Sequence, residues 1–395
     1  MKGFFHSSRV QVEPPEGSLV PKCGACGLFK SCQSPKMGPY GDGRKKVLVV
    51  GEAPGQTEDE DGRPFIGKAG TFLRQCLRQI GADLDQDAWT TNSLICRPPK
   101  NTTPEIKQIS YCRPNLLNTI KRFGPRVVLV LGKSALVSVI QGYWKTDLGA
   151  LDRWVGWKIP ISDHWICPTY HPSYLLRMKN PILDRAFVNH LRQAFLIDED
   201  PPRRPSLEGK INVLYEEGPV IETLREMDGE GGWVAVDYET NCLKPDYPEA
   251  RIVSCAVSDG KKTISYPWTK HARKATGILL RSGRTRKIAS NLKFEERWTL
   301  KEFGHGVNNW GWDTMLAAHC LDNRPHITSL KFQSLIQMGV PTYNENIEPY
   351  LGNIRGHYNR IQEVELRHLL FYGGMDALLE YRLAMLQRKE IGNED

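Results

Sequence analysis

Short apolar runs alternate with helix-like patterns through the first half of the chain. Residues 47–50 form an uninterrupted apolar run, and residues 72–80 then place apolar side chains on one helical face before Gly81. Further strands are expected at residues 126–132 and 164–170, and each is followed by another helical pattern. Strands that alternate with helices predict an α/β fold, with a central parallel sheet covered on both faces.

A second pattern begins after a charged, proline-rich segment at residues 198–205, a composition typical of a linker. Short strands precede any long helix in this second part, which predicts an antiparallel start to a mixed sheet. These strands are expected at residues 233–236, 252–257 and 263–266. The 395-residue chain is therefore divided into an N-terminal arm (1–20), a first domain (21–197), a linker (198–210) and a second domain (211–395).

One helix of the first domain carries two proline signals. Thr103 followed by Pro104 predicts a helix start, with threonine as the cap and proline at the first position. Pro114 lies within the same pattern and should kink or divide the helix, because proline removes a backbone hydrogen bond.

Composition and charge narrow the class of protein. The chain is 40% hydrophobic and 25% charged, as in ordinary globular proteins, and its net charge of +8 fits a polyanionic partner such as DNA. No apolar run approaches the roughly 18 residues that a membrane span needs, and the first ten residues lack the core of a signal peptide. We therefore expect no membrane partner and a cytoplasmic location.

A glycine-rich loop follows the first apolar run. It begins at Gly51 and Glu52 and continues through Glu58 and Phe65. In an open α/β sheet, the loop at the carboxyl end of a strand is where ligands bind, and glycine lets the backbone approach them closely. Acids and one aromatic ring in such a loop predict a pocket for a flat, polar group.

The string resembles the first motif of the family 4 uracil-DNA glycosylases, and it matches every fixed position of GEAPG-x-x-ED-x-x-G-x-PF-x-G-x-AG. The resemblance covers about residues 21–197 and implies a three-layer, parallel-sheet glycosylase domain. It also implies that uracil is removed from DNA by hydrolysis of the glycosidic bond.

The chemistry of base excision requires residues from several separate loops to act on one base. A glycosylase flips the nucleotide out of the helix and reads the base by stacking and by hydrogen bonds to its edge. Phe65 would stack on the pyrimidine, and the amide of Asn92 matches uracil O4 and N3–H. His171 would stabilise the uracil anion at O2, and Glu52 would position water or stabilise the sugar cation. The resemblance assigns Glu52 and His171 to catalysis, and Glu58, Phe65 and Asn92 to uracil.

His171 also opens the second family motif, His-Pro-Ser followed by apolar residues. Leu175 or Leu176 of this motif is expected to enter the space that the flipped nucleotide leaves in the duplex. Taken singly, Phe65 would be an ordinary core residue, Asn92 a turn cap and His171 a loop residue, so the prediction rests on their occurring together.

Four cysteines stand at spacings typical of a metal site. Cys23 and Cys26 form a C-x2-C, and Cys96 and Cys112 follow with fifteen residues between them. Four thiolates suit either zinc or an iron–sulfur cluster, and spacing alone does not choose between them. The family resemblance implies that these four cysteines bind a [4Fe–4S] cluster, with Cys32 as the one rival ligand.

Acidic residues mark the second domain. Asp237 and Glu239 are two apart on an expected strand, so their side chains share a face, an arrangement that suits a cation between them. Glu295 follows a later strand, and Tyr372 and Asp376 lie four apart on a late helix.

These residues resemble the three motifs of the 3′–5′ exonuclease domain of family A DNA polymerases, of the DEDDy class. The resemblance implies a ribonuclease H-like mixed sheet in which Asp237, Glu239, Glu295 and Asp376 bind two divalent ions, Mg²⁺ or Mn²⁺. Tyr372 matches the tyrosine that positions the attacking water. Glu295 departs from the pattern, which has aspartate there, and this leaves rate and metal preference open.

A basic run between the strands adds a candidate DNA surface at Arg281, Arg284 and Arg286; a solvated loop is the alternative. The sequence thus predicts a bifunctional enzyme that excises uracil and degrades DNA from its 3′ end. The alternative is a glycosylase for uracil or another deaminated base whose second domain binds DNA with weak or no nuclease activity. The two resemblances together point to a virus of bacteria. A DNA polymerase or other replication proteins are further candidate partners.

Overall fold

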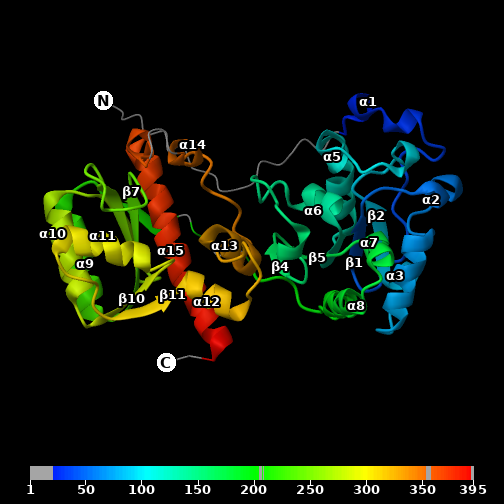
Figure 1. The fold of residues 1–395 in the computed structure, drawn as a ribbon. Helices are drawn as coiled ribbons and strands as arrows, with labels where there is room; N and C mark the ends of the chain where they lie inside the picture. The colour runs from blue at the N-terminus through cyan, green and yellow to red at the C-terminus, as the bar shows by residue number, and fades with distance from the viewer. Residues whose placement is uncertain (1–20, 204–206, 208, 353–356, 393–395) are drawn as a thin grey trace, which may run out of the picture. The chain divides into compact units, whose positions relative to one another are not determined.

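The computed structural model describes residues 21–203, 207, 209–352 and 357–392, so the predicted arm and part of the predicted linker lie outside it. The chain divides into two compact units (Figure 1). Unit 1 comprises Met1–Arg204 with Leu335–Pro341, and unit 2 comprises Pro205–Ser334 with Thr342–Asp395.

Unit 1 is built on a five-stranded sheet in the order β2-β1-β3-β5-β4. The first four of these strands are parallel, and β4 pairs antiparallel with β5. The strands are β1 (Val47–Gly51), β2 (Ala88–Asn92), β3 (Val127–Leu131), β4 (Ile159–Ile161) and β5 (His164–Thr169). All five residues of β1 and of β3 are buried, as expected of parallel strands covered on both faces.

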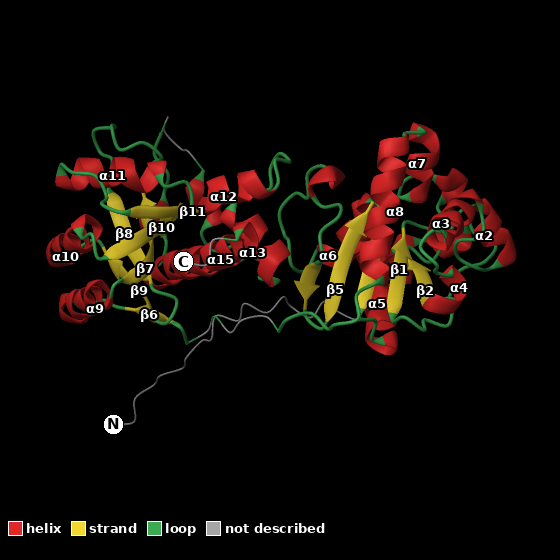
Figure 2. Ribbon diagram, turned by 90° about the horizontal axis from the view of Figure 1, so that it is seen from below, coloured by secondary structure: helices red, strands yellow, loops and turns green. Residues whose placement is uncertain are grey.

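Helices lie on both sides of this sheet (Figure 2). One layer contains α3 (Lys68–Arg78), α7 (Pro172–Met178) and α8 (Pro181–Phe195), whose apolar residues share a core with alternate residues of β1 and β3. The other contains α5 (Ile106–Phe123) and α6 (Lys133–Ile140), which pack on each other. The remaining helical segments of this part are α1 (Cys23–Cys26), η1 (Leu28–Lys30), α2 (Gln56–Asp61), α4 (Leu84–Asp87), η2 (Pro99–Asn101) and η3 (Leu151–Arg153). The predicted three-layer α/β fold is confirmed.

The predicted start of α5 was wrong, whereas a kink at Pro114 stays a prediction. The helix begins at Ile106, and Glu105 is its N-cap: the side chain of Gln108 accepts from the Glu105 N–H, so the cap lies two residues beyond Thr103. Pro114 lies inside α5 without dividing it.

Unit 2 contains a six-stranded sheet in the order β11-β10-β7-β8-β9-β6. β8 pairs antiparallel with β7 and β9, whereas β10, β11 and β6 join as parallel strands. The strands are β6 (Ile211–Val213), β7 (Gly232–Thr240), β8 (Ile252–Ser258), β9 (Thr263–Pro267), β10 (Thr285–Ala289) and β11 (Trp310–Asp313). The antiparallel start and the mixed sheet are confirmed.

The alternation of β7 decides which way its acids point. Val234 and Val236 pack in a core with α9 (Glu217–Glu230) and α10 (Lys270–Arg281), and Ala235 packs with α15 (Leu366–Ile391). Asp237 and Glu239 therefore share the face of Ala235 and point toward α15. The other helical segments are α11 (Lys293–Phe303), α12 (Thr314–Leu321), α13 (Leu330–Met338), α14 (Glu348–Leu351) and η4 (Ile361–Glu363). None of the described helices combines the length and apolar character of a membrane span.

Candidate functional sites

The first candidate pocket is centred on Gly51, the last residue of β1. Gly51 lies beside Asn92 in the parallel register of β1 and β2. A Cβ atom added to Gly51 would lie 2.4 Å from Asn92 Oδ1 and 2.7 Å from Phe65 Cζ. The amide and the ring predicted to bind uracil therefore both lie against a residue that has no side chain. Only glycine leaves room for this arrangement.

The backbone of Phe65 is held in place by α3. Phe65 has a positive φ of 59° and is 6% exposed. Its carbonyl oxygen accepts a hydrogen bond from Arg74, whose other terminal nitrogen donates to Asp85 at 2.6 Å. A Cβ atom on Gly70 would lie 1.7 Å from the same carbonyl oxygen, so this glycine is needed for the close approach. The unusual backbone of Phe65 is thus fixed from two sides, which orients its ring.

Glu58 holds the loop together. Its two carboxylate oxygens accept backbone N–H hydrogen bonds from Gly55 at 3.1 Å and from Gly67 at 2.8 Å. The neighbouring carboxylate of Asp59 is buried and accepts from the backbone N–H groups of Gln33 and Ser34. Glu58 therefore sets the shape of the loop, and its direct contact with uracil stays a prediction.

Glu52 lies at the start of the loop and is half-buried. Ser134, in the first turn of α6, donates its hydroxyl hydrogen to Glu52 Oε2 at 2.7 Å. The backbone carbonyl of Glu52 accepts from Ser93 at 2.6 Å. Ser134 is a positioning residue that the sequence did not single out, because no motif joins it to Glu52 across 82 positions.

His171 is the N-cap of α7, and its Nδ1 accepts the backbone N–H of Ser173 at 3.2 Å. An accepting Nδ1 places the proton of a neutral imidazole on Nε2. Burial, with Arg177 nearby, lowers the pKa of His171 to about 4. At neutral pH this side chain is therefore an uncharged hydrogen-bond donor through Nε2.

The strands bring these groups to one edge of the sheet. Glu52, Asn92 and His171 stand at or just beyond the carboxyl ends of the parallel strands β1, β2 and β5. Gly132 follows β3 between them, and a Cβ atom there would lie 3.0 Å from His171 Cβ. The carboxyl edge of a parallel sheet is where such folds bind ligands.

The two leucines of α7 differ in exposure. Leu175 is 1% exposed and belongs to the core shared with β1 and α8, whereas Leu176 is 39% exposed. Leu175 cannot enter DNA without leaving that core, so the prediction for Leu175 was wrong. Leu176 stays the candidate.

The four predicted cluster cysteines line one cavity, together with Leu28, Phe29, Leu94, Ile95 and Tyr111. Cys23 and Cys26 come from α1, Cys96 follows β2 and Cys112 lies in α5. A single tetrahedral zinc ion would bring its sulfur ligands to about 4 Å from one another. Among the described residues, no three cysteine sulfurs all lie within 4.8 Å of one another. The wider spacing and the apolar lining fit a larger cluster better than one zinc ion.

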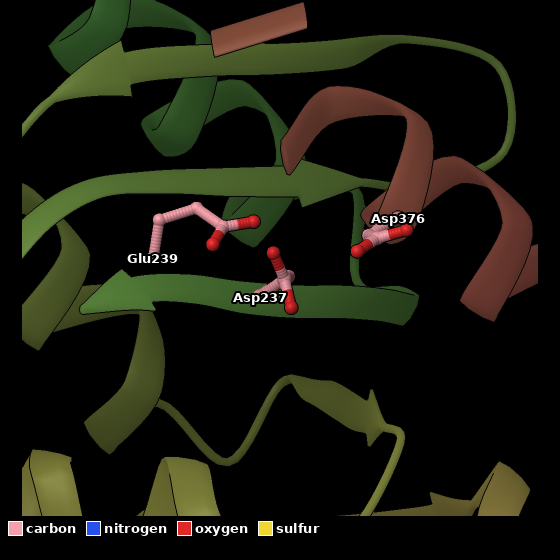
Figure 3. Close-up of side chains that lie close together, drawn as sticks. All are labelled: Asp237, Glu239 and Asp376. Atoms are coloured by element: carbon pink, nitrogen blue, oxygen red, sulfur yellow. The ribbon is translucent and has the colours of Figure 1, made fainter. Parts of the chain in front are cut away.

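The second candidate site lies between β7 and α15. Asp237, Glu239 and Asp376 each offer a carboxylate oxygen, and these oxygens all lie within 4.8 Å of one another (Figure 3). Burial and the neighbouring Asp376 raise the pKa of Asp237 to about 7, and burial with Asp237 raises the pKa of Glu239 well above its usual value. Clustered carboxylates repel, and a bound cation relieves that repulsion. These three residues could hold a divalent ion.

Asp376 and Tyr372 also share a partly buried lysine. Lys331, in α13, donates to Asp376 Oδ2 at 2.6 Å and to the Tyr372 hydroxyl oxygen at 2.7 Å. Tyr343 donates its hydroxyl hydrogen to the other oxygen of Asp376. Neither Lys331 nor Tyr343 belongs to the three motifs, so the sequence did not point to them.

Two further acids lie near this site. Glu295, in α11, is 3% exposed, and burial and Asp237 raise its pKa well above the usual value. Glu380, one turn beyond Asp376 in α15, is buried with a similarly raised pKa. Each keeps one carboxylate oxygen, Oε2, without a hydrogen-bond partner. Glu380 was missed, although its i,i+4 spacing from Asp376 was a usable signal.

The three predicted DNA-binding arginines, Arg281, Arg284 and Arg286, are exposed. The basic residues before them form α10, so the solvated-loop alternative is wrong for residues 270–281. Arg286 lies over the ring of Trp233, 5.3 Å from its centroid. DNA contact by these arginines stays a prediction.

Comparison with known proteins places the first unit in a family. Residues 39–195 match the uracil DNA glycosylase superfamily. The type-4 uracil-DNA glycosylase of Thermotoga maritima is 36% identical over 175 residues, which cover 44% of this chain and 88% of that protein. The chain belongs to the type-4 uracil-DNA glycosylase family. The family assignment rests on unit 1, and the predicted resemblance is confirmed there.

Other similarities extend into the second half. A DNA polymerase of Bacillus phage SP01 is 24% identical over 319 residues, which cover 72% of this chain and 33% of that polymerase. The exoribonuclease RNase D of Escherichia coli matches with a TM-score of 0.36 and 13% identity, over 46% of each chain. The chain thus spans a third of the polymerase and about half of RNase D. The function of unit 2 must be argued from its own residues.

Proposed function

We propose that the chain excises uracil from DNA with a first domain (21–197) and removes nucleotides from DNA 3′ ends with a second domain (211–395). The observation that carries the first activity is the convergence of Phe65 and Asn92 on Gly51, at the sheet edge where Glu52 and His171 also stand. Family membership supports the same activity.

The geometry accounts for hydrolysis of the glycosidic bond. A flipped uracil stacks on Phe65, and the Asn92 amide donates to O4 and accepts from N3–H. As the bond breaks, its electron pair moves to uracil, and the neutral His171 donates from Nε2–H to the anionic O2. Glu52, fixed by Ser134, faces the sugar cation and orients the water that adds to C1′. The products are free uracil and an abasic sugar.

Cys23, Cys26, Cys96 and Cys112 would hold a [4Fe–4S] cluster, which the family resemblance implies and their spread around one cavity fits. Because α1, the segment after β2 and α5 each supply a ligand, the cluster would join three separate parts of unit 1. Its role in this proposal is structural.

Unit 2 carries the second activity. Asp237, Glu239 and Asp376 would hold divalent metal, which when bound stabilises charge on a phosphate and activates water. Tyr372 lies one helical turn before Asp376 and would orient that water. Arg281, Arg284 and Arg286 would contact DNA phosphates. A DNA polymerase or another replication protein is a proposed partner.

Two alternative functions are each favoured by a different feature of the chain. The glutamate at position 295, where the resembled motif has aspartate, favours a unit 2 that binds DNA with weak or no nuclease activity. The proposed pocket contacts only O4, N3–H and O2 of uracil. This favours a glycosylase that also accepts other deaminated bases that present the same groups.

The test uses oligonucleotides that carry uracil, hypoxanthine, xanthine or mismatched thymine. Free base is measured for the wild type, for Asn92→Ala and for the exposed control Gly38→Ala, whose new Cβ atom meets nothing within 4 Å. We expect uracil release by the wild type and the control, and little by Asn92→Ala. Release of another base but not of uracil would refute the proposed substrate.

A further inference from the structure

Unit 2 has a cavity on the face of its sheet that points away from the carboxylates. The cavity lies between α9 and α10, which pack on each other and on this face, whereas α15 covers the other face (Figure 2). Its volume is about 450 Å³, within the range of pockets that bind one small ligand. Neither of the two proposed reactions uses it.

The walls of this cavity are aliphatic. Leu224 and Leu279 line it and are each 1% exposed, and Ile221 beside them is partly buried. Ile278 lines the same cavity, yet it is 57% exposed. A concave apolar surface that is left open to solvent in this way suits a flat apolar body such as a nucleobase.

Three cationic side chains surround the aliphatic walls. Arg225, Lys274 and Arg284 all line the cavity, and all three are exposed. Within the part of the chain that the structure describes, none of these three side chains has an ion-pair or hydrogen-bond partner. Their charges are therefore available to an anionic group bound beside the walls.

The acids nearby do not cancel this charge. Among the described residues that line the cavity, Asp228 is the only acid, and its charge acts on the buried Lys287. Burial lowers the pKa of Lys287 to about 8, and Asp228 opposes that lowering. α10 contains no acid. The other acids of α9 do not line the cavity, and three of them form ion pairs elsewhere: Glu217 with His271, Glu226 with Lys262, and Glu230 with Lys261.

Asp228 also supplies a hydrogen-bond acceptor. Its Oδ1 is buried and accepts no hydrogen bond from any described residue. A buried acceptor without a partner is unfavourable, so an N–H group of a ligand would be stabilised there. The amino groups of adenine, cytosine and guanine are donors of this kind.

We propose that the cavity between α9 and α10 binds a nucleoside 5′-monophosphate. The base lies against the aliphatic walls, its amino group donates to Asp228 Oδ1, and the phosphate lies among Arg225, Lys274 and Arg284. Three cations favour a terminal phosphate, with a charge near −2, over the single charge of a phosphate inside a DNA strand. The inference is independent of the nuclease activity, because Arg225, Lys274 and Asp228 take part in no step of that reaction.

The test is equilibrium dialysis of labelled deoxyadenosine 5′-monophosphate (dAMP) against the full chain carrying its cluster. EDTA is present, so that the acidic site holds no divalent ion. Lys274→Gln removes one cation, and Ile278→Glu places a negative charge on the exposed wall. Lys261→Gln is the matched control, because Lys261 is 82% exposed and does not line the cavity. Thermal unfolding shows whether each variant is folded.

We expect about one dAMP per chain in the wild type and in Lys261→Gln, and roughly 10-fold weaker binding in Lys274→Gln and in Ile278→Glu. No saturable binding would overturn the inference. So would an affinity that is unchanged in both cavity variants, since dAMP would then bind elsewhere.

Competition shows which part of the ligand is recognised. Inorganic phosphate lacks the base, deoxyadenosine lacks the phosphate, and a short oligodeoxyadenylate with a 5′-hydroxyl lacks the terminal phosphate. Each should compete at least roughly 10-fold less well than dAMP. Equal competition by phosphate would reveal a simple anion site, by deoxyadenosine a purely apolar site, and by the oligonucleotide a site for a DNA strand. Any of these three results would overturn the proposal.

Discussion

Gly51→Ala is the substitution that most directly tests the uracil pocket. The added methyl would lie 2.4 Å from Asn92 Oδ1 and 2.7 Å from Phe65 Cζ, so at least one of these groups must move by several tenths of an ångström or more. The backbone of Gly51 is not among the positive-φ positions, so the main chain tolerates alanine. The substitution should therefore displace Asn92 and Phe65, the two side chains expected to hold the base.

The expected magnitude follows from this displacement. A misplacement of about 1 Å costs roughly 10²-fold in rate, equivalent to about 2.7 kcal/mol of transition-state stabilisation. The loss should appear in single-turnover excision of uracil from a short oligonucleotide. The metal-dependent nuclease rate of the same sample should stay unchanged, because unit 2 contains none of the displaced residues.

Gly38→Ala is the matched control, since its Cβ atom would meet nothing within 4 Å and it lies in the same unit. Excision by Gly51→Ala at the wild-type rate would show that Asn92 and Phe65 need not keep their positions, and the pocket would then lie elsewhere.

Four further predictions concern His171, Glu58 and Asp237. Because the pKa of His171 is lowered to about 4, the imidazole stays neutral from pH 8 to 5. The single-turnover rate of uracil excision should therefore be constant over that range and fall only near pH 4. A fall in the rate centred near pH 6.5 would contradict this. The same shift makes the neutral His171 stabilise the fold above pH 6.5, and this contribution should be lost as pH falls from 6.5 through 4. Glu58→Ala removes the acceptor of two loop N–H groups and should lower the free energy of unfolding of unit 1 by about 2 kcal/mol in denaturant titrations. Glu60→Ala, at an exposed position, should change this free energy by less than about 0.5 kcal/mol. Equal effects of the two substitutions would show that Glu58 does not stabilise the loop. Asp237→Asn should slow 3′-end degradation roughly 100-fold or more and leave uracil release intact, and loss of both activities would show that the two sites are not independent.

Several strands of both units follow from patterns visible in the sequence. Uninterrupted apolar runs became the buried parallel strands β1 and β3, and short strands without intervening helices became the antiparallel pairs of β7, β8 and β9. The start of α8 also shows in the sequence, because Asn180 caps the helix and Pro181 fixes φ at its first position, and both effects are local.

Local signals failed where two of them competed. Thr103 and Pro104 resemble a helix start, yet Glu105 and Gln108 form the capping box that begins α5. Leu175 and Leu176 are neighbours on one helix, and the sequence alone did not show which one faces the core. Packing against β1 and α8 decides that question.

The least predictable residues act across long stretches of chain. Ser134 reaches Glu52 from another helix, and Lys331 reaches Tyr372 and Asp376 from α13. A motif gives residues their expected chemistry, but it does not show which other side chains the fold brings into contact with them. Those contacts came from the structure.

The central claim is that one chain carries a metal-independent glycosylase and a metal-dependent exonuclease. The most direct measurement uses the full chain and a 5′-labelled oligonucleotide with a single uracil, incubated with EDTA or with Mg²⁺ and then split for alkali treatment. We expect one alkali-dependent cut at uracil in EDTA and an additional ladder of shortened strands only with Mg²⁺. No cut at uracil under either condition, or a ladder that persists in EDTA, would contradict it.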